Sequence, residues 1–244
     1  MDKVIIFNQS LHQISYIATT TTKGEEYDMV KQYIKKLIFH YNKLKKKRAA
    51  IFIEPQIETG YPDIVIAEFH SAFPIKNEYR DLLTTEDLKI LFHIQQKRKI
   101  TSGQIEEDLG YPVSVIKSTI KHLKLANMIR TSDKGDIIQS ISLKKYYGIN
   151  KIISIEAKLN KWSEAIRQAE NNIWFSSESY VLLNKTKCND SIQKKCIESG
   201  VGIILVNGKI QTCLKSEKRN LPVSYASLQF NEWIYRYFSK KSEV

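Results

Sequence analysis

Residues 152 to 159 read Ile-Ile-Ser-Ile-Glu-Ala-Lys-Leu, and their β-branched side chains favour a β-strand. Side chains alternate between the two faces of a strand, so Glu156 and Lys158 share one face while Ala157 points with Ile155 into a core. A carboxylate beside an ammonium is costly on a strand built for burial, unless a metal, a phosphate or the partner charge compensates it. The apolar neighbours therefore indicate a central strand that carries chemistry, rather than an edge strand with a surface ion pair.

A second strand is predicted after the Gly-Tyr-Pro sequence at residues 60 to 62, where Asp63 precedes an apolar run that continues to Phe69. Taken alone, Asp63 also fits a turn residue that closes this Gly-Tyr-Pro segment, since Asp is common in turns. Acids at strand ends can, together with a lysine, hold a divalent cation and a phosphate. Asp63 is thus the second candidate for a functional carboxylate.

Pro62-Asp63 together with Glu156-Ala157-Lys158 resembles the PD-(D/E)XK nuclease superfamily, whose fold many restriction endonucleases, resolvases and repair nucleases share. The sequence after Lys158 agrees with the family core, because an apolar stripe at helical spacing from Trp162 to Trp174 is followed by an apolar strand at residues 180 to 183. The resemblance implies an α/β fold with a restriction endonuclease-like mixed central sheet flanked by helices.

The same resemblance implies a catalytic mechanism for the candidate residues. Asp63 and Glu156, with the carbonyl oxygen of Ala157, would bind Mg²⁺, for which Mn²⁺ could substitute. Lys158 would orient the attacking water or stabilise the transition state. Cutting both strands of a duplex would require two such sites, so a homodimer is expected.

Two further residues receive auxiliary catalytic roles from the resemblance. Gln168 flanks the apolar stripe of the helix after the acid-x-Lys strand, where the family often has a glutamine or lysine near the scissile phosphate. Glu26 lies on the inward stripe of a helix predicted from a capping box at Thr22 to about residue 44, where the family often carries a glutamate. The simpler interpretation of Gln168 is a solvated side chain at a helix boundary. The simpler interpretation of Glu26 is an acid that interacts favourably with the first turn of its helix.

The two acids of the motif lie far apart in the sequence, and an inserted domain explains this departure from the family pattern. Residues 84 to 94 begin with hydroxyl caps and acids, as helices do, and residues 102 to 109 predict a second short helix. Pro112 opens a third helix that runs to Ala126, and residues 127 to 143 predict a β-hairpin. Three helices and a hairpin look like a winged helix-turn-helix.

The expected domain organisation follows from this insertion. We expect residues 1–75 and 150–244 to form the two parts of the nuclease core, with residues 76–149 forming the inserted domain. The two ends of the insert should lie close together, because they join neighbouring strands of one sheet.

The predicted third helix carries basic and hydroxyl side chains that suit contacts with DNA phosphates and base edges. A solvated helix face is the alternative interpretation of the same pattern. The candidate residues on this helix are Ser114, Lys117, Ser118, Thr119, Lys121 and Lys124, and Lys134 in the hairpin turn would contact the DNA backbone.

Composition agrees with a polyanionic partner. Among the 244 residues, 38 Lys and Arg outnumber 26 Asp and Glu, for a net charge of +12. Such an excess favours nucleic acids through counterion release. The five histidines form no His-x-x-x-His pair, so a histidine metal site finds no support.

Cysteine usage and hydropathy bear on location. Cys188, Cys196 and Cys213 lack Cys-x-x-Cys spacing, which indicates neither a disulfide framework nor a structural zinc site and fits a reduced cytosol. The apolar run from Val4 to Phe7 is far shorter than the roughly 18 residues of a membrane span. We therefore expect a cytoplasmic protein without a membrane partner.

The sequence thus predicts a metal-dependent nuclease that hydrolyses phosphodiester bonds in DNA, with the winged helix positioning the substrate. One alternative is a non-catalytic DNA-binding regulator or assembly subunit of a defence or mobile-element system. Another is a subunit of a larger complex that cuts only when its partner is present.

Overall fold

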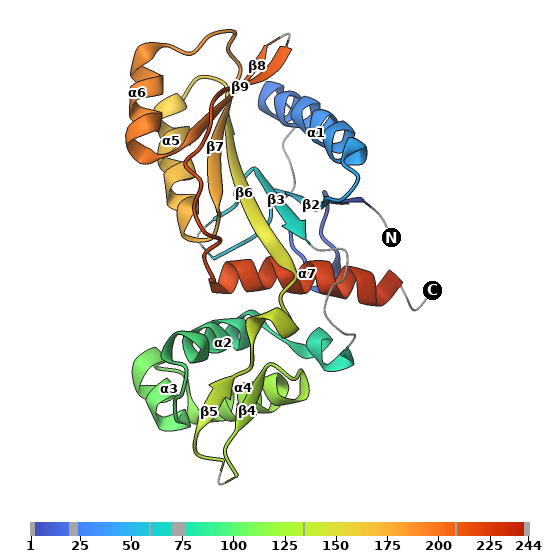
Figure 1. Cartoon of the computed structure of the whole chain (residues 1–244), viewed down its shortest axis with the longest axis vertical. Helices are drawn as coiled ribbons and strands as arrows, with labels where there is room; N and C mark the ends of the chain where they lie inside the picture. The colour runs from blue at the N-terminus through green and yellow to red at the C-terminus, as the bar shows by residue number, and fades with distance from the viewer. Residues whose placement is uncertain are drawn as a thin grey trace. The chain divides into compact units, whose positions relative to one another are not determined.

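The chain forms two compact units (Figure 1). Unit 1 comprises Met1–Ser71 and Ile149–Pro222, and unit 2 comprises Ala72–Gly148 and Val223–Val244. The computed structural model describes residues 3–19, 24–58, 60–69, 77–133, 135–207 and 209–241.

Unit 1 is built on a seven-stranded mixed sheet with the order β1-β2-β3-β6-β7-β8-β9. The β3 strand runs antiparallel to both β2 and β6, whereas β7 is parallel to β6 and to β8. The strands are β1 Val4–Phe7, β2 Arg48–Ile53, β3 Ile64–Phe69, β6 Ile149–Lys158, β7 Glu178–Leu183, β8 Gly202–Asn207 and β9 Lys209–Leu214.

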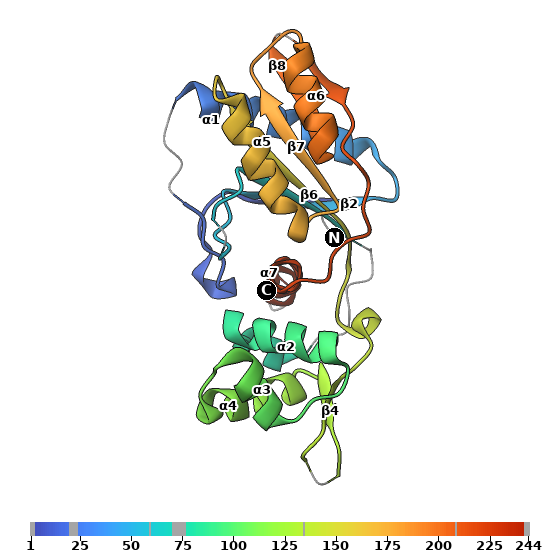
Figure 2. The same cartoon turned by 90° about the vertical axis from the view of Figure 1, so that its left-hand side faces the viewer.

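Helices cover both faces of this sheet (Figures 1 and 2). On one face lies α1 (Glu25–Lys43), whose buried stripe packs over apolar residues such as Ile155 and Ala157. On the other face lie α5 (Trp162–Asn171) and α6 (Asp190–Ser199), packed over Val181, Leu183, Ile203 and Leu205. The expected α/β class, with a central sheet flanked by helices, is confirmed.

The acid-x-Lys segment lies on β6, which is a central strand because it pairs with both β3 and β7. Ala157 and Ile155 are fully buried in the α1-side core, as the period of two predicted. The predicted capping residue Thr22 lies outside the described residues. The structure starts α1 at Glu25, with Gly24 at the N-cap and no side-chain cap hydrogen bond.

Unit 2 contains the helices and hairpin expected between residues 84 and 143. They are α2 Thr85–Lys97, α3 Ser102–Leu109, α4 Val113–Leu125, β4 Ile129–Thr131 and β5 Ile138–Ser140. Thr84 and Asp87 form a capping box at the start of α2, and Thr101 and Gln104 form another at α3. Gly110 takes the left-handed conformation that ends α3, with a φ of 68°.

The first segment of unit 2, Ala72–Gly148, lies in the chain between two paired strands. Phe69 at the end of β3 is the register partner of Ile149 at the start of β6. The chain therefore leaves and re-enters the sheet at neighbouring positions.

The C-terminal segment differs from the expected domain borders, which assigned residues 150–244 to the core. The last helix, α7 (Tyr225–Lys241), groups with unit 2. Its Leu228 is buried in the same apolar cluster as Leu88 of α2 and Leu123 of α4. The sequence does not show which apolar cluster α7 joins.

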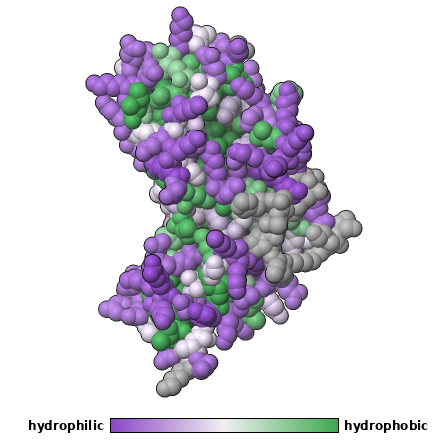
Figure 3. Space-filling view, viewed as in Figure 1, coloured by the Kyte–Doolittle hydropathy of each residue, from purple (hydrophilic) through white to green (hydrophobic). Residues whose placement is uncertain are grey.

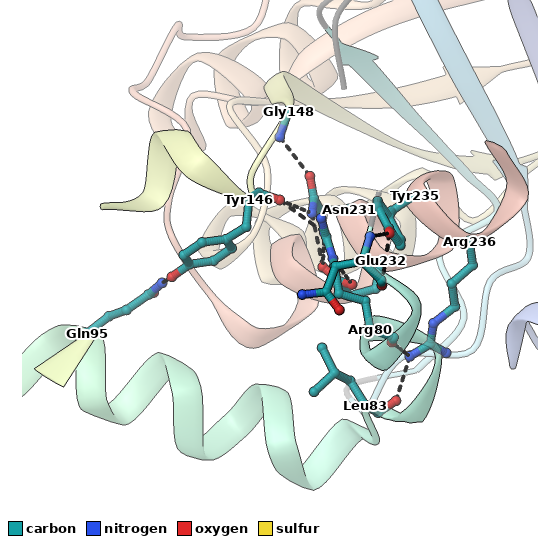
Figure 4. Close-up of polar contacts among 10 residues, drawn as sticks. Arg80, Leu83, Gln95, Tyr146, Gly148, Asn231, Glu232, Tyr235 and Arg236 are labelled. Carbon is teal, nitrogen blue, oxygen red and sulfur yellow. Dashed lines mark hydrogen bonds and ion pairs between the residues drawn. The ribbon is translucent and has the colours of Figure 1, made fainter. Parts of the chain in front are cut away.

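Polar side chains tie α7 to the rest of unit 2 through a buried network (Figure 4). The Arg80 guanidinium, from the 3₁₀ helix Glu78–Leu82, donates to Glu232 Oε2 at 3.0 Å and to Oε1 at 2.6 Å. Arg80 and Asn231 both donate to the carbonyl oxygen of Tyr146, each at 3.0 Å. The side chains of Arg80 and Glu232 are each only 2% exposed, so this ion pair is almost completely desolvated.

Hydrophilic residues cover most of the face seen in Figure 3, with hydrophobic residues in small groups between them. Within the described ranges, no helix has the length and apolar character needed to cross a membrane.

We predict that Glu232→Ala lowers the free energy of unfolding by about 3–5 kcal/mol, because it leaves the buried Arg80 charge without its partner. Urea unfolding followed by circular dichroism measures the loss. Lys97→Ala is the matched control, since it breaks an ion pair to Asp108 in which Lys97 is 50% exposed, and it should have a far smaller effect. Equal losses in the two variants would contradict a structural role for the buried pair.

Candidate active site

The pairing of three strands brings the predicted acids together at one end of the sheet. Because β3 is antiparallel to both β2 and β6, its start lies beside the ends of those two strands. Asp63 directly precedes β3, and Glu156 and Lys158 end β6, where Ile155 is the register partner of Ile64.

Each candidate side chain at this end has a defined hydrogen-bond partner. The backbone N–H of Ala157 donates to Asp63 Oδ2 at 2.6 Å, which ties the first acid to the acid-x-Lys strand. Lys158 Nζ donates to Glu26 Oε1 at 3.1 Å, so the start of α1 contributes to the same site. Glu156, only 4% exposed, accepts a bond of 2.6 Å from Asn172 Nδ2.

Burial and like charges shift the protonation of the two acids. Burial raises the pKa of Asp63 to about 6; the Ala157 N–H and Lys158 oppose the shift, whereas the charges of Glu26 and Glu54 add to it. The pKa of Glu156 is raised well above its usual range, first by burial and then by the charge of Asp63. The Asp63 and Glu156 carboxyl groups are thus buried near each other, and ionisation of both is unfavourable because of desolvation and charge repulsion.

Lys158 experiences opposing effects. Desolvation, the largest single effect, lowers its pKa, but the neighbouring carboxylates of Asp63, Glu26 and Glu156 together raise the pKa above its usual value. Its ammonium therefore stays protonated at neutral pH and available as a hydrogen-bond donor.

The ligands at this end of the sheet suit a Mg²⁺ ion that keeps several waters better than a metal ion bound entirely by protein side chains. No group of three or more His, Cys, Asp or Glu side chains is placed to hold a metal within the described parts of the chain. Mg²⁺ usually takes only one or two carboxylates and keeps several waters. Asp63, Glu156 and the Ala157 carbonyl oxygen match that requirement, and a cation would relieve the repulsion that raises the pKa of both acids.

One face of α5 is directed at the acid-x-Lys segment. Glu164, Gln168 and Asn172 are spaced four residues apart, which places them on one side of the helix and its 3₁₀ extension Asn172–Trp174. Asn172 bonds to Glu156, and Glu164 lines a pocket of about 350 Å³ together with Glu26 and Lys158.

Gln168 lies one turn from each of these two helix positions. Its Oε1 atom is buried and has no hydrogen-bond partner among the described residues. The predicted auxiliary glutamine is therefore on the helix face that carries Asn172 and Glu164, with an unused acceptor.

Sequence reasoning missed two residues of this site. Asn172 could have been found from its spacing of four residues from Gln168. Glu54 follows β2, its N–H donates to the Asp63 carbonyl oxygen at 3.0 Å, and its φ of 46° is in the strained left-handed region. No sequence pattern signals Glu54, because only the antiparallel pairing brings it near Asp63.

In unit 2, α4 exposes most of the residues predicted to contact DNA. The exposed ones share one helix face, and they are Ser114, Lys117, Ser118, Lys121 and Lys124. Lys134 lies outside the described residues.

Thr119 corrects the expectation for this helix. It is only 2% exposed, and its hydroxyl donates to Asp87 Oδ1 at 2.5 Å. Asp87 also accepts from His122 at 3.1 Å, so this cluster joins α2 to α4. Thr119 is thus a core residue, because its side chain points to α2 instead of solvent.

No protein-family model matches the chain, and neither a curated protein nor a solved structure matches it.

We predict that Asp63→Asn stabilises the metal-free protein at pH 8 by about 2–3 kcal/mol and has little effect at pH 4. The folded-state pKa of about 6 lies above the ordinary 3.8. The stability gained from protonated Asp63 is therefore present below pH 4 and lost as the pH rises through 6, whereas asparagine cannot ionise. Urea unfolding in EDTA from pH 4 to 8 measures this difference.

The control is Asp108→Asn, because Lys97 and His93 lower the pKa of Asp108. Its effect should have the opposite sign, with stability lost at neutral pH. An effect of Asp63→Asn that does not change with pH would contradict the raised pKa of Asp63 in the folded protein.

Proposed function

We propose that this chain is a metal-dependent nuclease of the PD-(D/E)XK superfamily that hydrolyses phosphodiester bonds in DNA. One observation carries the proposal: Asp63, Glu156 and Lys158, which resemble the family motif in sequence, lie at one end of the sheet. The Asp63 carboxylate accepts a hydrogen bond from Ala157, the residue between the other two.

The order of the elements supports the proposal. After the acid-x-Lys strand β6 the chain forms α5 and then the parallel strand β7, as the family resemblance requires. The long separation of the two acids in sequence is accounted for by the segment Ala72–Gly148 of unit 2, which lies between the paired residues Phe69 and Ile149.

In the proposed site, Asp63, Glu156 and the Ala157 carbonyl oxygen would hold Mg²⁺, with Mn²⁺ as a substitute. When bound, the ion supplies a water of lowered pKa and neutralises charge that develops on the phosphate.

The remaining side chains would hold the reactants in place. The Ala157 N–H fixes one oxygen of Asp63, and Asn172 fixes one oxygen of Glu156. The Lys158 ammonium, kept in position by Glu26, would donate to the attacking water or to the phosphate. Gln168 would use its unpartnered Oε1 to orient a water or a nucleotide group.

The three helices and hairpin of unit 2 support a winged helix-turn-helix as the DNA-binding part. The exposed basic face of α4 would enter the major groove, and the turn with Lys134 would contact the backbone. The net charge of +12 favours the same partner. Cutting of both strands would need a homodimer or a partner subunit, since one chain carries one proposed site.

We predict that Asp63→Ala, Glu156→Ala and Lys158→Ala each reduce Mg²⁺-dependent cleavage by at least about 100-fold, because each removes a metal ligand or the transition-state donor. Plasmid, linear and single-stranded substrates with Mg²⁺ or Mn²⁺ measure the loss, and circular dichroism checks the fold.

Lys89→Ala is the matched control, because Asp87-Leu88-Lys89 has the same acid-x-Lys pattern but lies on α2. This variant should cut at the wild-type rate. Cleavage retained by any two of the three site variants would rule out the assigned site. DNA binding by a wild-type protein that cuts no substrate would favour the non-catalytic regulator instead.

We predict that replacing Lys117, Lys121 and Lys124 by Ala weakens DNA affinity and flattens the plot of log K against log salt by about 0.9 per lost phosphate contact. Fluorescence anisotropy at several salt concentrations measures the slope. The control replaces Lys144 and Lys145, exposed lysines of unit 2 outside α4. An unchanged slope in the α4 variant would point to a protein-binding role for this helix.

A further inference from the structure

Unit 1 contains a second pocket, away from the candidate active site. It has a volume of about 330 Å³ and is lined by the second half of α1 and by the α1-side face of the sheet. On β3 it reaches Glu68, five residues along the strand from Asp63, which corresponds to about 16 Å. The volume falls within the range of about 300–1,000 Å³ for small-molecule sites.

Two buried carboxylates in this pocket are already satisfied by the protein. Glu68 accepts from Tyr41 Oη at 2.9 Å and from Lys47 Nζ at 2.8 Å. Glu178 in the same way accepts from Tyr180 Oη at 2.9 Å and pairs with Lys151 Nζ at 2.8 Å. Since each acid has one ammonium and one phenol, neither requires a bound cation.

The pocket lining therefore carries an excess of positive charge and of hydrogen-bond donors. Lys36, Lys47 and Lys151 outnumber the two glutamates; Lys36 Nζ also donates to the Ile210 carbonyl oxygen, and the His40 ring adds an N–H donor. An ammonium has three N–H donors, and each glutamate takes one from its lysine. The Tyr33 hydroxyl remains protonated as a further donor, because burial raises its pKa.

Apolar side chains complete the lining. Leu37 of α1 and Ile66, Ile153 and Ile204 of the sheet line the same pocket. Apolar walls with a few polar groups are typical of small-molecule sites. Apolar walls beside ammonium groups suit a molecule with an apolar body and one acidic group.

We propose that this pocket is a binding site for a small organic anion, a molecule with an apolar body that bears a phosphate or a carboxylate. The lysines and His40 bind the acidic group, and the isoleucines contact the apolar body. The site is independent of the proposed nuclease chemistry.

The test is isothermal titration calorimetry of the full-length protein in EDTA. The probes are adenosine 5′-monophosphate and indole-3-carboxylate. Two half-probes serve as controls: inorganic phosphate, which lacks the organic body, and adenosine, which lacks the acidic group. Both anions should bind at one site per chain, at least tenfold more tightly than either half-probe. The tighter of the two anions shows whether the site prefers the phosphate or the carboxylate ligand.

Variants locate the binding. The double variant Lys36→Gln, His40→Gln should weaken binding at least tenfold, and it leaves both buried carboxylates paired, so its fold is preserved. Lys35→Gln, an exposed lysine of α1 that does not line the pocket, is the matched control. Lys158→Ala, which removes the ammonium group next to Asp63 and Glu156, should leave binding unchanged.

Three results would overturn the proposal. They are affinities no tighter than those of the half-probes, full binding by the double variant, and loss of binding in Lys158→Ala. The last would place the anion at the proposed nuclease site, while the cleavage assay of the previous section would still test that function separately.

Discussion

The antiparallel pairing of β3 with both β2 and β6 is the constraint on which the rest of unit 1 depends. At one end of these strands the register sets Ile64 beside Ile155, so that Asp63 meets the acid-x-Lys segment. At the other end it sets Phe69 beside Ile149, so that the segment Ala72–Gly148 can be inserted without breaking the sheet. A slip of one residue would turn Glu156 into the α1-side core and destroy the site.

The candidate site is held together at an electrostatic cost. Two acids are desolvated side by side, which raises the pKa of both, and Glu54 adds a strained backbone conformation. The apolar clusters on the two faces of the sheet must offset that cost, since the site itself does not stabilise the fold. The pocket with Glu68 and Glu178 differs, because there every buried carboxylate has a lysine and a tyrosine as partners.

Much of the secondary structure could be predicted from sequence because the residues that start and end each element lie within or next to it. The start of α2 after Thr84, the end of α3 at Gly110 and the central position of the strand with Glu156 follow from caps, glycine and hydrophobic period. Where the prediction failed, the deciding contact was distant in sequence. Thr119 fits an exposed hydroxyl face by spacing alone, but Asp87 on another helix accepts its hydrogen bond.

The sequence by itself determined the helices and hairpin between residues 84 and 143 and the pair Glu156 and Lys158 on one strand face, since these depend on neighbours within a few residues. Only the tertiary structure decided that Asn172 and Glu54 join Asp63 and Glu156, and that α7 groups with unit 2 through Glu232 and Arg80. The physical reason is that strand register and buried ion pairs arise from interactions between segments far apart in the chain, for which no local period exists.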